Sequence, residues 1–308
     1  MTTRGASMPR VSCVRGGTML RIHAPAKVNL YLAVGPVRPD GYHPVDTVLH
    51  ALEFGDEVTV GPSERLRFSC VPDLGLADDD NLAYKAMLAM AGHFDREPLV
   101  SVTVRKRVPA GAGLGGASSD AAAVIVGLAT LWGVSERGED LHSIARSLGA
   151  DVPFFLDGGA ARFTGRGDVF LRRLPALDVP VVLVRPAEPV ATAEAYRAFD
   201  DMPHEAAPPV EPLERALVEG DTQRVAALLF NAMTPSSARL VPSVGHALDL
   251  VRSHPGVLGA AMAGSGSAVF GICDVSGSAE ACAAHAAEAG YWSAATRTCG
   301  RACAVERD

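Results

Sequence analysis

The chain has 308 residues, of which 48% are hydrophobic and 20% are charged, and its net charge is −7. This apolar content supports a folded core, so a largely disordered chain is excluded, and the length fits two domains or one large one. A nucleic-acid-binding protein usually shows a basic footprint, which is absent here, and no apolar run reaches the ~18 residues of a membrane span. We therefore expect neither a nucleic-acid partner nor a membrane partner.

The cysteines and the N-terminus carry information about the compartment. Six cysteines are scattered along the chain without a C-x-x-C pair. This pattern is typical of reduced thiols in a cytoplasmic protein, and the spacing does not fit a zinc site. Residues 1–18 are polar and lack the apolar segment of a secretory signal, so we expect a disordered or mis-called N-terminal extension.

The first half of the chain is predicted to be rich in strands. Alternating or β-branched apolar residues indicate five strands, at 20–34, 45–60, 66–71, 99–104 and 154–163. Three helices are predicted among them, at 82–92 after the capping residues Asp80 and Asn81, at 121–132, and at 141–148 before Gly149.

The second half is predicted to be mostly helical from Thr192 onward, after a strand at 181–184. Strands at 258–263 and 268–273 enclose a glycine-rich turn, and a helix at 279–289 and a last strand at 292–298 close the chain. A linker is indicated by four prolines, Pro203, Pro208, Pro209 and Pro212. Because strands and helices do not alternate regularly, the pattern favours an α+β fold over a doubly wound sheet.

The strongest local signal is a glycine-rich loop from Pro109 to Asp120, which directly precedes the predicted helix at 121–132. Its glycines lack Cβ atoms, so the backbone can adopt positive φ and approach a ligand closely. The start of the helix presents free N–H groups and a partial positive charge. A loop of this kind that leads into a helix is typical of a phosphate-binding site.

The residues alone suggest four interpretations of this loop, of which three stay open. Gly111, Gly113 and Gly116 match the dinucleotide pattern G-x-G-x-x-G, but no acidic residue ends a clear strand ~20 positions later. A P-loop is excluded because the chain has no Gly-Lys pair. A nucleoside-triphosphate loop of another family and a flexible turn without a ligand remain.

The loop sequence PAGAGLGGASSD resembles the phosphate-binding motif of the GHMP small-molecule kinases. Pro25–Leu30 is similar to the N-terminal motif of that superfamily, and Gly264–Ser267 to its C-terminal glycine turn. Asp40–His43 and Leu148–Phe155 resemble the branch that acts on a cytidine-diphosphate-linked methylerythritol in non-mevalonate isoprenoid synthesis. The motifs occur in the family's order and span about Met19 to Phe270.

This resemblance implies two domains with the active site between them. Residues 19–175 would form an N-terminal domain like domain 2 of ribosomal protein S5, and residues 176–308 a ferredoxin-like C-terminal domain. The implied reaction is phosphorylation of the 2-hydroxyl of the methylerythritol by ATP. Mg²⁺ is expected because phosphoryl transfer needs charge neutralisation, with Ser119 as the candidate ligand and no carboxylate ligand assigned. A monomer and a homodimer both remain open.

The resemblance also implies catalytic roles for two residues. Asp151 matches the family's catalytic aspartate, which accepts the hydroxyl proton. Lys27 would keep Asp151 ionised and stabilise charge at the phosphoryl group. The alternatives are a capping or turn aspartate and a surface lysine on an edge strand. Asn29 lies on the same strand face as Lys27 and is expected to orient the lysine or bind substrate.

The remaining site residues follow the same motifs. Tyr42 would stack on the cytosine, His43 would hydrogen-bond the pyrimidine, and Thr192 and Ser265 would lie near substrate phosphate. The residues expected to bind ATP are Pro109, Ala110, Gly111, Ala112, Gly113, Leu114, Gly115, Gly116, Ala117, Ser118 and Ser119.

The sequence departs from the family pattern at Pro44, Ala232 and Ala263, and these departures bear on substrate fit and C-terminal packing. Other functions therefore stay open. They are a homoserine- or mevalonate-type kinase of the same superfamily, a non-catalytic nucleotide-binding protein, and a dinucleotide-dependent oxidoreductase.

Overall fold

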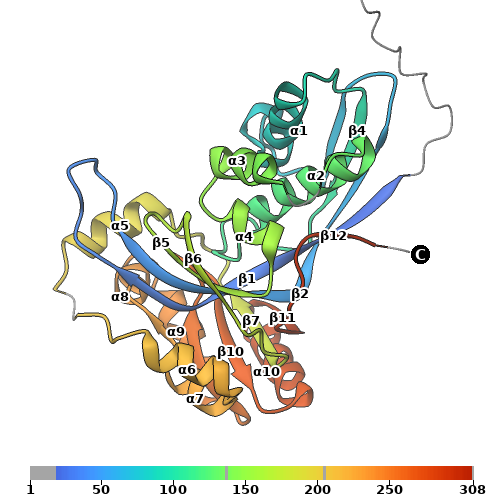
Figure 1. The fold of residues 1–308 in the computed structure, drawn as a ribbon. Coiled ribbons are helices and arrows are strands. Elements are labelled where there is room, and N and C mark those ends of the chain that lie inside the picture. The colour runs from blue at the N-terminus through green and yellow to red at the C-terminus, as the bar shows by residue number, and fades with distance from the viewer. Residues whose placement is uncertain (1–18, 136–137, 204–205, 307–308) are drawn as a thin grey trace, which may run out of the picture.

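A computed structural model describes residues 19–135, 138–203 and 206–306, so the expected N-terminal extension lies outside the described residues. The strands form one sheet of eight and one of four, with helices packed against both (Figure 1), which confirms the α+β prediction. Most strand pairs are antiparallel, and the doubly wound dinucleotide fold is therefore wrong for this chain. No helix in the described part is long and apolar enough to cross a bilayer.

The larger sheet is built on two long antiparallel strands, β1 (Leu20–Val34) and β2 (Val45–Pro62). Its main path runs β12-β1-β2-β4-β3, while β5 pairs with β2 and β6, and β8 pairs with β1. The other strands of this sheet are β3 (Arg67–Val71), β4 (Val100–Arg105), β5 (Ala160–Thr164), β6 (Val169–Leu174), β8 (Phe230–Asn231) and β12 (Ala304–Val305). The strands predicted before residue 105 are confirmed.

Helices of the first half cover one side of β1 and β2 (Figure 1). Every residue of α2 from Ser119 to Ala129 is buried, because this apolar helix packs between the sheet and its neighbouring helices. Asn81 caps α1 by accepting a hydrogen bond from the amide of Ala83, as predicted. The elements on this side are η1 (Asp78–Asp80), α1 (Leu82–His93), α2 (Gly116–Trp132), α3 (Glu139–Leu148) and α4 (Val152–Asp157).

The smaller sheet has the antiparallel order β11-β7-β10-β9. Helices separate β7 from β9 and β10 from β11, which gives the βαββαβ arrangement of a ferredoxin-like unit and matches the expectation for this half. Its strands are β7 (Pro180–Arg185), β9 (Val257–Met262), β10 (Val269–Cys273) and β11 (Trp292–Arg297). The helices are α5 (Thr192–Asp200), α6 (Glu211–Glu219), α7 (Thr222–Ala227), α8 (Thr234–Leu240), α9 (Pro242–Ser253) and α10 (Ser276–Glu288).

Three predictions about these elements are wrong. The single strand expected at 154–163 is the helix α4 followed by the strand β5, because Pro153 fits the first turn of a helix. Pro212 likewise begins α6 instead of extending a linker. The strand β11 does not close the chain, since residues after it return to the first sheet as β12.

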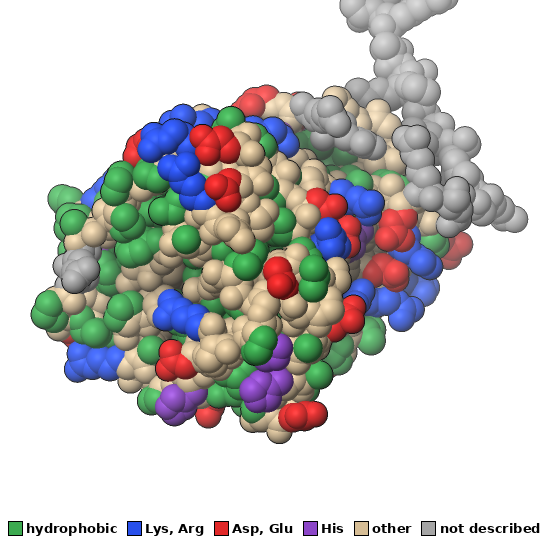
Figure 2. Space-filling model, turned by 90° about the horizontal axis from the view of Figure 1, so that it is seen from below, with side chains coloured by type: hydrophobic (Ala, Val, Ile, Leu, Met, Phe, Trp, Pro, Cys, Tyr) green, Lys and Arg blue, Asp and Glu red, His purple; other side chains and the backbone are tan. Residues whose placement is uncertain are grey.

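The two halves of the chain are interleaved at β1. The short strands β8 and β12, both from the second half, pair with β1 near its two ends. A further bridge joins Leu52 of β2 to Thr298. The division at 175/176 stays a prediction. On the face shown in Figure 2, acidic and basic side chains are interspersed over the described residues instead of forming one basic patch.

His50, a fully buried residue of β2, links the first sheet to the segment that precedes β7. Its Nδ1 donates to the carbonyl of Ala51 at 2.9 Å, and its Nε2 accepts from the amide of Leu177 at 2.9 Å. The bond accepted by Nε2 requires a neutral ring, and burial lowers the pKa of His50 from 6.5 to about 4.

Acid should therefore destabilise the fold through His50. Because the folded pKa lies below the unfolded value, the unfolded chain takes up the proton first, and stability falls as the pH drops from 6.5 towards 4. Between pH 7 and pH 5 we expect His50 to account for a loss of about 2 kcal/mol. Urea unfolding at both pH values checks this, with His50→Gln as the non-titrating comparison. An equal pH-dependent loss in the variant would contradict the assignment.

Candidate active site

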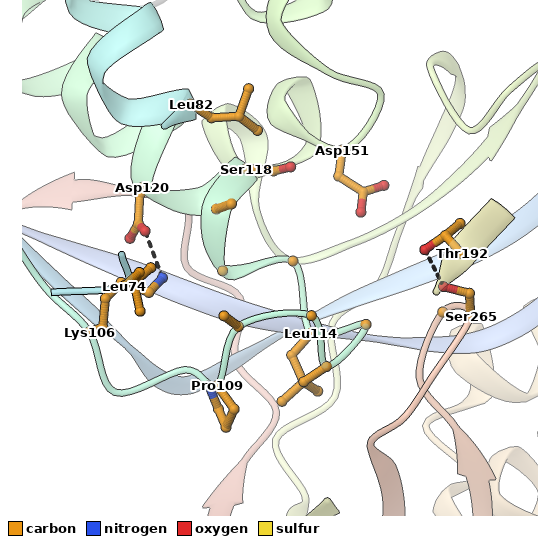
Figure 3. Close-up of a pocket in the computed structure, with 18 of the residues that line it drawn as sticks. Leu74, Leu82, Lys106, Pro109, Leu114, Ser118, Asp120, Asp151, Thr192 and Ser265 are labelled. Carbon is orange, nitrogen blue, oxygen red and sulfur yellow. Dashed lines mark hydrogen bonds and ion pairs between the residues drawn. The ribbon is translucent and has the colours of Figure 1, made fainter. Parts of the chain in front are cut away.

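A cavity of about 500 Å³ opens between the glycine loop, α4 and the turn between β9 and β10. It is lined by Lys27, Asp151, Thr192, Ser265 and the loop from Pro109 to Ser118. Figure 3 shows Lys106 and Asp120 joined at one end of the pocket and Thr192 and Ser265 joined at the other. The structure therefore brings most of the sequence-predicted residues into one place.

Alternating residues anchor the glycine loop to the core and bend it. Ala112 and Leu114 are buried in the apolar cluster beneath the loop. The glycines between and beside them, Gly111, Gly113 and Gly115, have φ of +65°, +77° and +75°, a region that favours glycine. The carbonyl of Leu114 accepts from the amide of Lys27 at 3.0 Å, so the loop occupies the edge of β1 between β12 and β8.

The loop delivers unpaired amides to the pocket at the start of α2. The first intrahelical bond of α2 is donated by Ser119 to the carbonyl of Gly115 at 2.9 Å. The amides of residues 116–118 precede it, and the first N–H groups of a helix have no intrahelical partner. These residues line the cavity, where they form an anion-binding surface at the positive end of the helix.

Lys27 is buried in the middle of β1, with 4% of its side chain exposed, so the edge-strand surface lysine is excluded. Its Nζ donates to Asn29 Oδ1 at 2.8 Å and lies 3.7 Å from Asp151 Oδ2. Asp151 precedes α4 and makes no capping hydrogen bond, so its carboxylate is available to face Lys27. The predicted sharing of one strand face by Lys27 and Asn29 is confirmed.

Asn29 also connects the lysine to the glycine turn between β9 and β10. The Oδ1 atom that accepts from Lys27 also accepts from the amide of Gly264 at 2.8 Å. Its Nδ2 donates to Thr47 Oγ1 at 2.9 Å. Asn29 is thus held at both ends of its amide group and fixes the position of the lysine. The contact with Lys27 is compatible with the expected orienting role, and both roles expected for Asn29 stay predictions.

Two further polar residues hold the glycine turn and were missed by the sequence interpretation. Asn231 Nδ2 donates to the carbonyls of Met262 and Gly264 at 2.7 and 2.8 Å. Ser237 Oγ donates to the carbonyl of Ser265 at 2.9 Å. Nothing in the local sequence could identify these contacts, because the partners are about 30 residues apart and meet only in the folded chain.

Thr192 and Ser265, both expected near substrate phosphate, are brought together by the fold. Their hydroxyl oxygens lie 2.9 Å apart at one end of the pocket, where the start of α5 meets the glycine turn (Figure 3). Ala263, one of the departures from the family pattern, is fully buried before this turn. The carbonyl of Ala263 faces Gly113 of the glycine loop.

Tyr42 and His43 lie outside the lining of this cavity, on the connection between β1 and β2. Arg166 lies over the ring of Tyr42 at 3.5 Å from its centroid. His43 Nδ1 contacts the carbonyl of Gly35 at 2.8 Å, and its Nε2 lies 3.3 Å from Asp200. A hydrogen bond from Nε2 of His43 to a pyrimidine would therefore have to replace the contact with Asp200.

Tyr196 of α5 completes this aromatic group and was not singled out from the sequence. Its ring stacks on His43 with centroids 5.0 Å apart. Burial, and after it the charge of Asp151, raises the pKa of Tyr196. An aromatic residue in a helix usually packs in the core, so nothing in the sequence pointed to Tyr196 as part of the site.

Ser119 does not line the pocket, unlike its neighbour Ser118. Its side chain is fully buried, and its Oγ lies 3.7 Å from Cys303 Sγ in the segment that leads to β12. The backbone amide of Ser119 is used within α2. The structure therefore gives Ser119 a packing position and leaves Ser118 as the loop hydroxyl that faces the cavity.

The oxygen donors at the pocket fit a magnesium ion that arrives with a nucleotide. Among the described residues, no three acidic, histidine or cysteine side chains gather into a cluster that could hold a metal alone. Ser118 offers a hydroxyl and Asp151 a carboxylate. Mg²⁺ commonly takes one or two protein oxygens and completes its shell with substrate phosphates and water.

Comparison with known proteins identifies the family. Residues 81–159 match the GHMP kinases N terminal domain, and residues 213–291 match the GHMP kinases C terminal domain. The chain is 37% identical over 284 residues to a 4-diphosphocytidyl-2-C-methyl-D-erythritol kinase of Desulfitobacterium hafniense (strain Y51), covering 92% of this chain and 97% of that protein. A kinase of the same name from Mycolicibacterium gilvum (strain PYR-GCK) is 37% identical over 268 residues, covering 84% and 83%.

Solved structures agree with these relatives. The crystal structure of a 4-(cytidine 5'-diphospho)-2C-methyl-D-erythritol kinase matches with a TM-score of 0.77 and 34% identity, over 90% of this chain and 98% of that one. A homoserine kinase from Cytophaga hutchinsonii ATCC 33406 shares the fold at a TM-score of 0.73 and 19% identity, over 97% and 100%. The chain therefore belongs to the GHMP kinase superfamily and, within it, to the family of the 4-diphosphocytidyl-2-C-methyl-D-erythritol kinases.

Proposed function

We propose that the protein transfers the γ-phosphoryl group of ATP to the 2-hydroxyl of 4-diphosphocytidyl-2-C-methyl-D-erythritol. The observation that carries this proposal is the buried Lys27 beside Asp151, 3.7 Å apart, in the same cavity as the unpaired amides of the glycine loop. The chain's 37% identity to kinases of that name supports this choice of substrate.

The nucleotide would bind along the loop. The amides of residues 116–118 and the positive end of α2 are arranged to receive its phosphates. Beyond the loop, Leu74, Leu76 and Leu82 give one end of the cavity apolar walls that suit an adenine ring. The residues Pro109 to Ser118 would therefore contact ATP, with Mg²⁺ neutralising charge on the phosphates when it is bound and Ser118 as its loop ligand.

Asp151 would act as the base at the other end of the phosphates. It accepts the proton of the substrate hydroxyl as that oxygen forms a bond to the γ-phosphorus, and the bond from the γ-phosphorus to the bridging oxygen of ADP breaks. The ammonium of Lys27, which lies 3.7 Å from Asp151 Oδ2, stabilises negative charge on the transferred group. Asn29 keeps the lysine aimed at this point through its bond to Nζ.

The rest of the substrate would extend towards Thr192, Ser265 and the β1–β2 connection. The two hydroxyls at the pocket's end provide donors for the diphosphate. Tyr42 is 52% exposed with Arg166 over one face of its ring, and it directly precedes His43, whose ring stacks on Tyr196. These rings suit a pyrimidine base, because aromatic faces stack on any planar base.

A coupled ADP-release assay tests the proposal. The cytidyl substrate, homoserine and mevalonate are compared at equal concentrations, since kinases for all three share this fold. We expect kcat/KM for the cytidyl substrate to exceed the others by about 100-fold or more, a difference of roughly 3 kcal/mol. Equal or higher turnover of homoserine or mevalonate would overturn the substrate, and no ADP release with any of them would favour a non-catalytic nucleotide-binding protein.

Removing the ring of Tyr42 should weaken binding of the cytidyl substrate alone. We expect Tyr42→Ala to raise the KM for that substrate about tenfold, because base stacking contributes about 1–3 kcal/mol, and to leave the KM for ATP unchanged. Phe170, which is 50% exposed and lies on β6 outside the cavity, provides the matched control as Phe170→Ala. Equal effects of Tyr42→Ala on both KM values would count against stacking.

A further inference from the structure

Three charged side chains that the proposed reaction does not use lie together beside the two ends of the glycine loop. The ammonium of Lys106 contacts Asp56 and lies 2.6 Å from Asp120 Oδ2. Only 7% of the Lys106 side chain, 0% of Asp56 and 6% of Asp120 is exposed. Lys106 is one of three lysines in a chain whose basic residues are otherwise arginines, and Figure 3 shows its contact with Asp120 at the edge of the pocket.

These residues join the two ends of the loop. Lys106 directly follows β4 and lies before the glycine loop. Asp120 is the fifth residue of α2 and lies at the other end of that loop. Asp56 of β2 accepts the amide of Val108 at 2.8 Å and also contacts the amide of Arg107, so it fixes the backbone at the loop entry. A Cβ atom at Gly116 would lie 3.1 Å from Lys106 Nζ, so the start of α2 sits directly against the ammonium.

The second carboxylate is not needed for charge balance. Lys106 and Asp56 alone would form a neutral buried pair, whereas Asp120 adds a second carboxyl group, whose buried Oδ1 has no hydrogen-bond partner among the described residues. Burial raises the pKa of Asp120 to about 7, against the opposing effect of Lys106. Burial also disfavours the charge on Lys106, but the carboxylates of Asp120 and Asp56 outweigh it and raise the pKa of the lysine.

A buried carboxylate with one oxygen unpaired destabilises a fold, so stability alone does not explain Asp120. We propose that Lys106 and Asp120 are positioning residues for the phosphate loop, whose contact ties the loop entry to α2 and aims the amides of residues 116–118 at the nucleotide before it binds. The inference rests on the proposed function, because it requires ATP phosphates at this loop. Asp120 acts through Lys106 and the backbone and need not touch the substrate.

Asp120→Leu is the variant that separates positioning from stability. It cuts the link between the loop ends, removes the unpartnered oxygen, and leaves the neutral pair of Lys106 with Asp56 intact. Asp120→Asn keeps an amide oxygen that can still accept from Lys106, so it serves as the conservative rescue. Asp140→Leu is the matched control, because Asp140 also forms one ion pair, with His93 in this case, and lies on α3 outside the cavity.

Isothermal titration of ADP and of the cytidyl substrate, with melting temperatures measured in parallel, provides the test. We expect the Kd for ADP to rise tenfold or more in Asp120→Leu and less than threefold in Asp120→Asn and Asp140→Leu. The Kd for the cytidyl substrate should change less than twofold in every variant, and the melting temperature of Asp120→Leu should equal or exceed that of the wild type.

Two results would overturn the inference. One is an unchanged Kd for ADP in Asp120→Leu. The other is a lower melting temperature in both Asp120 variants, with equal loss of affinity for ADP and the cytidyl substrate, which would show a general structural role. Failure of the wild-type protein itself to bind ADP would instead contradict the proposed function. Failure of the inference and failure of the proposed function are therefore distinguishable.

Discussion

Replacing Asp151 by asparagine is expected to lower kcat about 10³-fold while leaving nucleotide binding nearly intact. General-base catalysis contributes roughly 10²- to 10⁴-fold, and an amide cannot accept the hydroxyl proton. The shape of the side chain is retained, and Asp151 makes no capping bond whose loss would disturb α4. Steady-state kinetics and titration with ADP measure the two effects separately.

Asp157→Asn is the matched control for this variant. Asp157 ends the same helix, contacts His142 and forms an ion pair with Arg173, but it does not line the cavity. We expect its kcat to stay within about twofold of the wild type, because exposed ion pairs stabilise a fold by 0–1 kcal/mol. Near-normal turnover in Asp151→Asn would refute the role of Asp151 as the base.

The variant Gly113→Ala is expected to separate the glycine loop from the glycine turn between β9 and β10. We expect it to lower kcat/KM for ATP about 100-fold or more. A Cβ atom there would lie 2.1 Å from the carbonyl oxygen of Ala263, so backbone would meet backbone and one segment would have to move. The bond from the amide of Ala268 to the carbonyl of Ala112 would be disturbed by the same movement. A 100-fold loss corresponds to roughly 3 kcal/mol.

Gly111 isolates the effect of that clash from backbone strain. Both glycines have positive φ, +65° at Gly111 and +77° at Gly113, but a Cβ atom at Gly111 would meet no atom within 4 Å. Gly111→Ala therefore carries only the strain of a left-handed alanine, about 1–2 kcal/mol. We expect kcat/KM for ATP to fall about tenfold or less in this variant. Equal losses in the two variants would show that the contact with Ala263 is unimportant.

The motifs with local sequence signatures could be predicted, because neighbouring residues determine their geometry. The glycines of the loop and the apolar helix after it fix a phosphate cradle within one short segment. The alternation along β1 placed Lys27 and Asn29 on one strand face, and the hydrogen bond between them follows from that spacing.

Features that depend on distant contacts could not be predicted from the sequence. The group of Asp56, Lys106 and Asp120 joins residues 50 positions apart, and the scarcity of lysine was its only signal. The short strand β12 has two residues and is defined by its pairing with the edge of β1, a contact between the two ends of the chain.

Local ambiguity explains the wrong strand at 154–163. A short apolar run such as Val152–Leu156 fits a buried helix as well as a strand, and periodicity cannot separate the two. Proline is common in the first turn of a helix, and Pro153 occupies that place in α4. Val169–Leu174 was missed as strand β6, because nearly all of its residues are exposed and it lacks an apolar alternation.

A crystal structure with a non-hydrolysable ATP analogue and the cytidyl substrate tests the central claim most directly. The triphosphate should lie on the amides of residues 116–118, with the 2-hydroxyl within about 3 Å of a carboxylate oxygen of Asp151 and facing the γ-phosphorus. A triphosphate bound away from the glycine loop, or a hydroxyl out of hydrogen-bond reach of Asp151, would contradict the claim.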